Sequence, residues 1–173
     1  SDDNDADGIK DFLENDGSCP DYADDDSDDD GILDGNEDAN VNGIFDSGET
    51  DLCDADTDGD GIQDGTEIGL TVPQGKDTKP DPGVFIADAD PTTRTNPLSS
   101  DSDGDSLPDG SEDSDYNGAR NGSETSDAAR LDTDGDSLSD WEELNAGFDG
   151  YQTNPLDTDS DDDGLNDGTE SRS

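Results

Sequence analysis

The chain has no histidine and no methionine, and it has few basic side chains. Only 7 residues are Lys or Arg against 53 Asp or Glu, which gives a net charge of −46. The absence of histidine excludes a Ser-His-Asp triad, a His-ligated zinc site and a histidine general base. The shortage of positive charge argues against a nucleic-acid partner, because phosphate contacts require a basic surface.

Apolar side chains are also scarce. Leu, Ile, Val and Phe make up 24 of the 173 residues, about 14%, which is below the roughly 20% at which a strongly charged chain is expected to be disordered. There is no run of 18 apolar residues, so no membrane span is predicted. No signal peptide is visible, so an exported form would be a mature chain or a fragment. Bound cations are the candidate source of folding free energy, since metal binding stabilises other small-core proteins.

The acidic residues follow a twelve-residue pattern that occurs eight times. Asp or Asn occupies positions 1, 3, 5 and 9, Glu occupies position 12, Gly or Ser occupies position 6, and an apolar residue occupies position 7. These segments, here called loops one to eight, begin at Asp3, Asp26, Asp38, Asp56, Asp101, Asp113, Asp132 and Asp159. Positions 1, 3, 5, 9 and 12 of these loops hold 36 of the 53 acids. An acidic surface adapted to high salt predicts scattered acids, so this spacing favours metal sites.

Calcium fits the pattern best, because it takes six to eight oxygen ligands at about 2.3–2.6 Å. Position 6 requires a sharp turn, which glycine makes at little steric cost. The predicted side-chain ligands are Asp3, Asp5, Asp7, Asp11, Glu14, Asp26, Asp28, Asp30, Asp34, Glu37, Asp38, Asn40, Asn42, Asp46, Glu49, Asp56, Asp58, Asp60, Asp64, Glu67, Asp101, Asp103, Asp105, Asp109, Glu112, Asp113, Asp115, Asn117, Asn121, Glu124, Asp132, Asp134, Asp136, Asp140, Glu143, Asp159, Asp161, Asp163, Asp167 and Glu170. The predicted backbone-carbonyl ligands are the position 7 residues Ile9, Ile32, Ile44, Ile62, Leu107, Ala119, Leu138 and Leu165.

The eight loops predict about eight or more calcium ions. Loops three and six carry asparagines among their ligands and are expected to bind more weakly. Apart from Ala119, the position 7 side chains are expected to form a thin apolar spine. Consecutive loops abut at a twelve-residue step, which leaves no room for the flanking helices of an EF-hand. Two short segments, 126–131 and 140–145, are the best helix candidates.

The segment Asp-Thr-Asp-Gly-Asp-Gly-Ile-Gln-Asp-Gly-Thr-Glu at 56–67 resembles a thrombospondin type 3 repeat, especially the bacterial type found in surface proteins. Thr-Asn-Pro-Leu at 95–98 and 153–156 resembles the lead-in of those repeats. The resemblance covers nearly the whole chain except about 68–94. It implies little regular secondary structure, an elongated tandem array wound around a line of calcium ions, and an extracellular or cell-surface location. It also implies that neighbouring loops share a second ion, for which Asp24, Asp54 and Asp157 are spare acids.

Two cysteines, Cys19 and Cys53, flank loops two and three. In an exported protein with a small core they would close one disulfide; in a reducing cell they would remain free thiols. The chain is expected to divide into a loop array over 1–67, an insertion or connector over 68–100, and a second loop array over 101–173. Two short extended segments are expected within the connector, at 69–73 and 83–87.

The predicted function is structural, as a rigid stalk, spacer or filament subunit outside the cell that partners calcium and, if it polymerises, copies of itself. The alternative is an adhesin that binds a glycan or another surface protein through 68–94 or the region around Trp141. A calcium store is a weaker alternative, because it would need no long repeat. No enzyme is expected: the carboxylate pairs are accounted for as metal ligands, and the chain lacks a core that could form a catalytic cleft.

Overall fold

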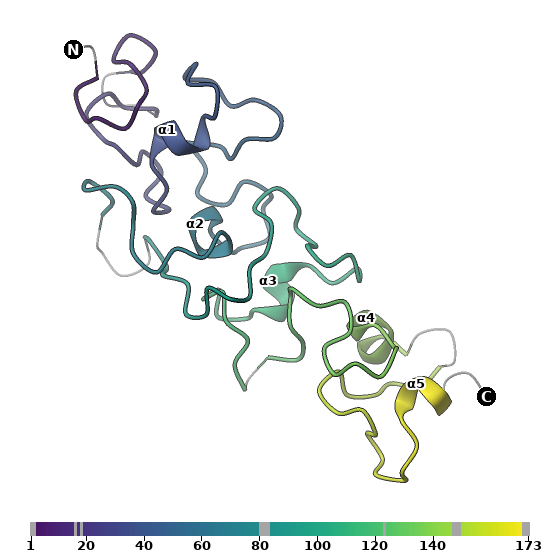
Figure 1. Ribbon diagram of the computed structural model, residues 1–173. Helices are drawn as coiled ribbons and strands as arrows, with labels where there is room; N and C mark the ends of the chain where they lie inside the picture. The colour runs from purple at the N-terminus through teal and green to yellow at the C-terminus, as the bar shows by residue number, and fades with distance from the viewer. Residues whose placement is uncertain are drawn as a thin grey trace. The chain divides into compact units, whose positions relative to one another are not determined.

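A computed structural model describes residues 3–15, 17, 19–79, 84–122, 124–146 and 150–170. Most of these residues lie in turns, bends and irregular segments. The helices are five single turns (Figure 1): α1 Asp34–Glu37, α2 Asp64–Glu67, α3 Asp109–Glu112, α4 Asp140–Leu144 and α5 Asp167–Glu170. The described ranges contain no strand, and their β-type pairing is limited to two isolated bridges. The predicted low content of regular secondary structure is therefore confirmed.

All five helices lie inside loops rather than beside them. Each begins at position 9 and reaches position 12, in loops two, four, five, seven and eight. In α1 to α4 the residue before the helix is extended, as at Leu33 with φ −75° and ψ 139°, so the helical turn begins directly at position 9. Residues three apart on a helix lie on one face. The single turn therefore places the position 9 Asp and the position 12 Glu side by side.

The helix predicted at 140–145 is confirmed as α4, but the one predicted at 126–131 is wrong. There the Asp127 carboxylate accepts a hydrogen bond from the Ala129 N–H at 3.2 Å, and the Asp127 carbonyl accepts one from the Arg130 N–H at 2.8 Å. Aspartate often closes such local turns in competition with a helix. The segment is consequently a turn that leads into loop seven.

The short strands expected in the connector are also wrong for the residues that are described; Gly83 lies outside them. Backbone groups here bond mainly to other parts of the chain. The Ile86 N–H donates to Gln63 Oε1 at 2.7 Å, and the Val84 carbonyl accepts from Gln63 Nε2 at 2.7 Å. Asp88, which follows the second segment, donates its N–H to the Leu70 carbonyl of the first at 2.7 Å. A strand ladder does not form, because loop side chains occupy these backbone groups.

The chain divides into two compact units. Unit one comprises Ser1–Ser100 and Tyr116–Ala119, and unit two comprises Asp101–Asp115 and Arg120–Ser173. Helices α1 and α2 belong to unit one, whereas α3, α4 and α5 belong to unit two. Among the described residues, no helix is long and apolar enough to cross a membrane.

Buried aliphatic side chains are few, and most of them are at position 7. Ile9, Ile32, Ile62 and Leu138 are buried there, and Leu52 is buried between loops. The predicted spine is incomplete, because the position 7 residues of loops three and eight, Ile44 and Leu165, are 62% and 52% exposed. Buried acids outnumber buried aliphatic residues in the described chain. Apolar burial therefore contributes unusually little to holding the fold.

The predicted disulfide is confirmed. Cys19 and Cys53 are bonded across a sequence separation of 34 residues. The bond joins the segment that precedes loop two to the segment that precedes loop four, so it encloses loops two and three. Cross-linking of this kind restricts the unfolded chain and stabilises the fold.

Candidate metal centres

The backbone of all eight loops follows one course. Position 6 has a positive φ in every loop, with glycine in six and serine in loops five and seven, where Ser106 and Ser137 have φ of 88° and 86°. Position 4 has a positive φ in every loop as well, at Ala6, Asp29, Val41, Gly59, Gly104, Tyr116, Gly135 and Asp162. Two left-handed residues separated by one other residue turn the chain back on itself. The requirement at position 6 was predicted; the one at position 4 was not.

Hydrogen bonds inside each loop use one carboxylate oxygen and leave the other available. In loops one, two, four, five and seven, Oδ1 of the position 3 Asp accepts from the backbone N–H of position 5, as in Asp30 N–H to Asp28 Oδ1 at 3.1 Å. Oδ2 of the same residues is buried and has no hydrogen-bond partner, in Asp5, Asp28, Asp58, Asp103 and Asp134. Buried polar atoms are nearly always paired. Their repeated lack of a partner therefore makes these oxygens candidate ligands for a cation.

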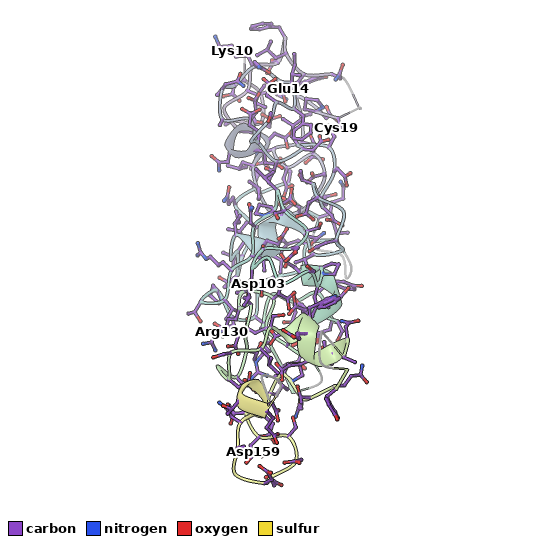
Figure 2. The ribbon with its side chains drawn as sticks, turned by 90° about the vertical axis from the view of Figure 1, so that its right-hand side faces the viewer. Lys10, Glu14, Cys19, Asp103, Arg130 and Asp159 are labelled. Atoms are coloured by element: carbon purple, nitrogen blue, oxygen red, sulfur yellow. A yellow bond between two sulfur atoms is a disulfide. The ribbon has the colours of Figure 1, made fainter. Side chains whose placement is uncertain are left out.

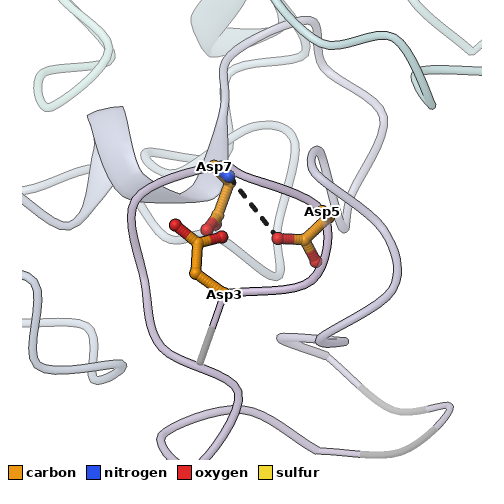
Figure 3. A group of neighbouring side chains, drawn as sticks. All are labelled: Asp3, Asp5 and Asp7. Atoms are coloured by element: carbon orange, nitrogen blue, oxygen red, sulfur yellow. Dashed lines mark hydrogen bonds between the residues drawn. The ribbon is translucent and has the colours of Figure 1, made fainter. Parts of the chain in front are cut away.

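Carboxylates at positions 1, 3 and 5 converge. Figure 3 shows the side chains of Asp3, Asp5 and Asp7 turned into the interior of loop one. One oxygen from each of these residues lies within 4.8 Å of the others, and the same holds for the corresponding acids at positions 1, 3 and 5 of loops two and four. Acidic side chains such as Glu14, Asp103 and Asp159 occur throughout the chain (Figure 2). The described residues thus contain several groups that could hold a metal ion.

The glutamate at position 12 has a strongly raised pKa in loops one, two, four, five and seven. Both oxygens of Glu14, Glu37, Glu67 and Glu112 are buried without a hydrogen bond of normal geometry. Burial raises the pKa of Glu37 to about 11, and the charges of Asp28 and Asp30 add to the shift. The same causes raise the pKa of Glu14 to about 8. A buried carboxylate needs either a proton or a cation nearby, and here the neighbouring acids favour a shared cation.

Other acids form groups between loops. Asp7 and Glu14 of loop one converge with Asp34 of loop two, with one oxygen from each within 4.8 Å of the others. Asp30, Glu37 and Asp64 repeat this arrangement between loops two and four. Each group combines positions 5 and 12 of one loop with position 9 of a later loop. Neither group contains the spare acids Asp24 or Asp54, so the sharing expected from the resemblance would use the loops' own residues.

A backbone contact accompanies the sharing of acids between loops. Oδ2 of the position 5 Asp accepts a hydrogen bond from the N–H of position 10 in another loop. The N···O distance is 2.9 Å from Gly65 of loop four to Asp30 of loop two, 2.7 Å from Trp141 of loop seven to Asp105 of loop five, and 2.5 Å from Gly168 of loop eight to Asp136 of loop seven. A Cβ on Gly65 would lie 2.1 Å from the Asp30 carbonyl oxygen. A Cβ therefore does not fit at Gly65, although loop seven makes the equivalent bond from Trp141.

Loops three and six differ from the other loops. In loop three, Asn40 and Asn42 donate side-chain hydrogen bonds to Asp46 at 3.1 and 2.9 Å, and Asp46 is exposed. In loop six, Asn121 donates to Asp115 and to Glu124, both at 3.0 Å. In these two loops, side-chain amides thus donate hydrogen bonds to acids at ligand positions 3, 9 and 12. Weaker metal binding by these two loops stays a prediction.

Hydroxyl groups at position 2 were missed by the sequence reasoning. The Thr57 hydroxyl donates to Asp64 Oδ2 at 2.5 Å and accepts from the Asp51 N–H at 2.8 Å. Equivalent bonds run from Ser27, Thr133 and Ser160 to the position 9 Asp of their own loops. Each hydroxyl thus fixes one ligand candidate and the lead-in segment together. The signal was present in the sequence as Ser or Thr after the first Asp of loops two, four, five, seven and eight.

No protein-family model, curated protein or solved structure matches this chain. The assignment of a function therefore depends on the geometry of the loops.

Proposed function

We propose that the loops are calcium sites and that the chain is a calcium-stabilised structural protein of the extracellular space or cell surface. The observation that carries the proposal is the set of buried, unpartnered carboxylate oxygens at positions 3 and 12. They come from five of the eight loops and point to one kind of ligand, a hard cation. The absence of histidine and the all-oxygen donor set favour calcium over zinc or copper.

Ions of two kinds are proposed. One kind lies within a loop, between positions 1, 3 and 5. The other kind lies between two loops, where positions 5 and 12 of loop one meet position 9 of loop two, and where positions 5 and 12 of loop two meet position 9 of loop four. The second kind would tie these loops together and build the tandem array. Such an array would serve as a stalk, spacer or filament subunit, in keeping with the resemblance to thrombospondin type 3 repeats.

The extracellular location is supported by the disulfide, because such bonds persist mainly in oxidising compartments. Extracellular calcium modules bind with dissociation constants of about 10⁻⁴–10⁻³ M, which millimolar calcium saturates. The carboxylates have a local explanation as ligands, so no catalytic role is proposed.

Calcium counting tests the proposal. The chain is stripped with a chelator, returned to millimolar calcium, and its bound calcium is measured by atomic emission. At least eight ions per chain are expected. Glu37→Gln is expected to lower that number, because Glu37 is part of the group between loops two and four.

Glu142→Gln is the matched control. Glu142 is half-buried in α4 but occupies position 11, which is not a ligand position. Its substitution should leave the calcium count unchanged. A chain that binds only one or two ions, or a Glu37→Gln variant that binds as many ions as the parent, would contradict the proposal.

A further inference from the structure

We infer that the two units need calcium to different extents, so that calcium removal unfolds unit two before unit one. The inference rests on the proposed calcium function and adds an order of events to it. Its basis is a set of contacts in unit one that require no ion.

The first of these contacts is made by residues 74–79, here called the cationic strap, which lie against loop two. Lys76 Nζ lies 3.0 Å from Asp25 Oδ2 and 2.8 Å from the carbonyl oxygen of Asp5. Lys79 Nζ lies 2.6 Å from Asp29 Oδ2. The strap thus places two ammonium groups against the most acidic part of the chain.

Backbone bonds strengthen the strap more than the ammonium groups do. Lysine side chains that are 63% and 58% exposed form weak ion pairs on their own. The N–H groups of Lys76 and Asp77, however, donate to the Asp25 carboxylate at 3.2 and 3.0 Å, and the Lys79 N–H donates to Asp29 at 2.7 Å. Amide bonds to carboxylates with little exposed area are stronger than ordinary ones. The strap therefore offsets part of the negative charge at and beside loop two without an ion.

The strap also closes over a ligand candidate. The Thr78 hydroxyl donates a hydrogen bond to Asp26 Oδ2, and Asp26, at position 1 of loop two, is 0% exposed. Gln74 fixes the start of the strap, because its N–H donates to the Gly31 carbonyl at 2.8 Å. Loop two is consequently held in its turned form by partners from another part of unit one.

The segment that lies 75 residues after loop two, at loop five, lacks the acids that bind the strap. The loop starts repeat at an offset of 75 residues, from Asp26 to Asp101. At the same offset, Asp24 and Asp25 correspond to serines and Asp29 corresponds to Gly104. Loop five therefore has no equivalent of this cation-binding face.

Three further features stabilise unit one without an ion. Both cysteines of the chain lie there, and their disulfide encloses loops two and three. Four of the five buried Ile and Leu side chains of the described residues also lie there, the exception being Leu138. The Phe85 ring lies against Gly31 of loop two, in the space that a Cβ would occupy. None of these contacts has an ion as a partner.

Hydrogen exchange of the full chain across a series of buffered free-calcium concentrations tests the inference. Peptides from 26–67 report on unit one, and peptides from 126–146 report on unit two. Unit two is expected to lose half of its protection at a free calcium concentration about threefold or more above that for unit one, given the usual effect of a disulfide and the linkage of binding to folding. Equal midpoints, or earlier loss in unit one, would overturn the inference.

A variant series identifies the cause. Lys76→Gln/Lys79→Gln combined with Cys19→Ser/Cys53→Ser should move the unit one midpoint toward that of unit two and leave unit two unchanged. Arg120→Gln/Arg130→Gln removes two cations from unit two and should leave the unit one midpoint in place. An unmoved unit one midpoint in the first variant would contradict the assigned cause. If hydrogen exchange in both units were independent of the free calcium concentration, the proposed function would instead be contradicted.

Discussion

At the scale of single residues, the position 3 aspartates divide their two oxygens between different partners. Asp134 Oδ1 accepts from the Asp136 N–H at 3.0 Å, while Asp134 Oδ2 is buried without a partner. The hydrogen bond to Oδ1 fixes the shape of the loop, whereas Oδ2 remains available to a ligand. Alanine would remove both, so substitutions here would combine loss of shape with loss of a ligand candidate.

Serine at position 6 is predicted to cost stability. Ser106 and Ser137 have positive φ, which is unfavourable for any residue with a Cβ. Ser106→Gly and Ser137→Gly should each raise the free energy of unfolding by about 1 kcal/mol. Thermal unfolding in saturating calcium measures the effect.

Ser111→Gly is the control for these two variants. Ser111 lies within α3, where glycine is disfavoured, so the substitution should lower stability by up to about 1 kcal/mol. If Ser106→Gly lowered stability as Ser111→Gly does, the conformational explanation for position 6 would be wrong.

At the scale of elements, the joint between loops two and four consists of the one-turn helix α2 set against loop two. Helix α2 presents Asp64 and Glu67 on one face, and the N–H of Gly65 meets Asp30 of loop two. These two loops thus contact each other through backbone and carboxylate groups. A side chain that fills the space at this contact should separate the two loops.

Gly65→Ala is predicted to break the joint between loops two and four. Its Cβ would lie 2.1 Å from the Asp30 carbonyl oxygen, which belongs to the backbone and cannot easily shift. Overpacking of this kind costs about 1–3 kcal/mol. Helix propensity alone predicts the opposite sign, because alanine is favoured over glycine in a helix.

The matched control is Gly122→Ala. Gly122 also occupies position 10, in loop six, but a Cβ there would meet nothing within 4 Å. Its melting temperature should be close to that of the parent. A Gly65→Ala variant that melts at or above the parent temperature would rule out the close contact between loops.

The sequence predicted the loops better than it predicted their surroundings. Spacing alone located the twelve-residue segments, the turn at position 6 and the disulfide, because these depend on residues close to one another or on the only two cysteines. The left-handed turn at position 4 was hidden, since residues as different as Val41 and Tyr116 occupy it. The strap was hidden as well, because nothing in the sequence pairs Lys79 with Asp29, which lies 50 residues away.

The one-turn helices illustrate a different reason for failure. A segment of four residues, such as Asp34–Glu37, is too short to show helical periodicity. Its helix is specified by the loop that contains it. Sequence reasoning therefore treated these residues only as ligand candidates, and the shared face of positions 9 and 12 emerged from the structure.

At the scale of the whole molecule, a net charge of −46 must be balanced. Self-repulsion on this scale opposes any compact state. Eight divalent ions would neutralise about a third of the charge, and additional ions between loops would neutralise more. The central claim is therefore that bound calcium, rather than an apolar core, supplies most of the folding free energy.

Small-angle X-ray scattering before and after chelation tests this claim most directly. A compact chain of this length has a radius of gyration near 16 Å, and an unfolded one about 44 Å. In millimolar calcium a folded particle is expected, with a radius well below the unfolded value and above that of a globule if the loops form an extended array. After chelation the radius should rise toward about 44 Å. A particle whose dimensions do not change on chelation would contradict the claim.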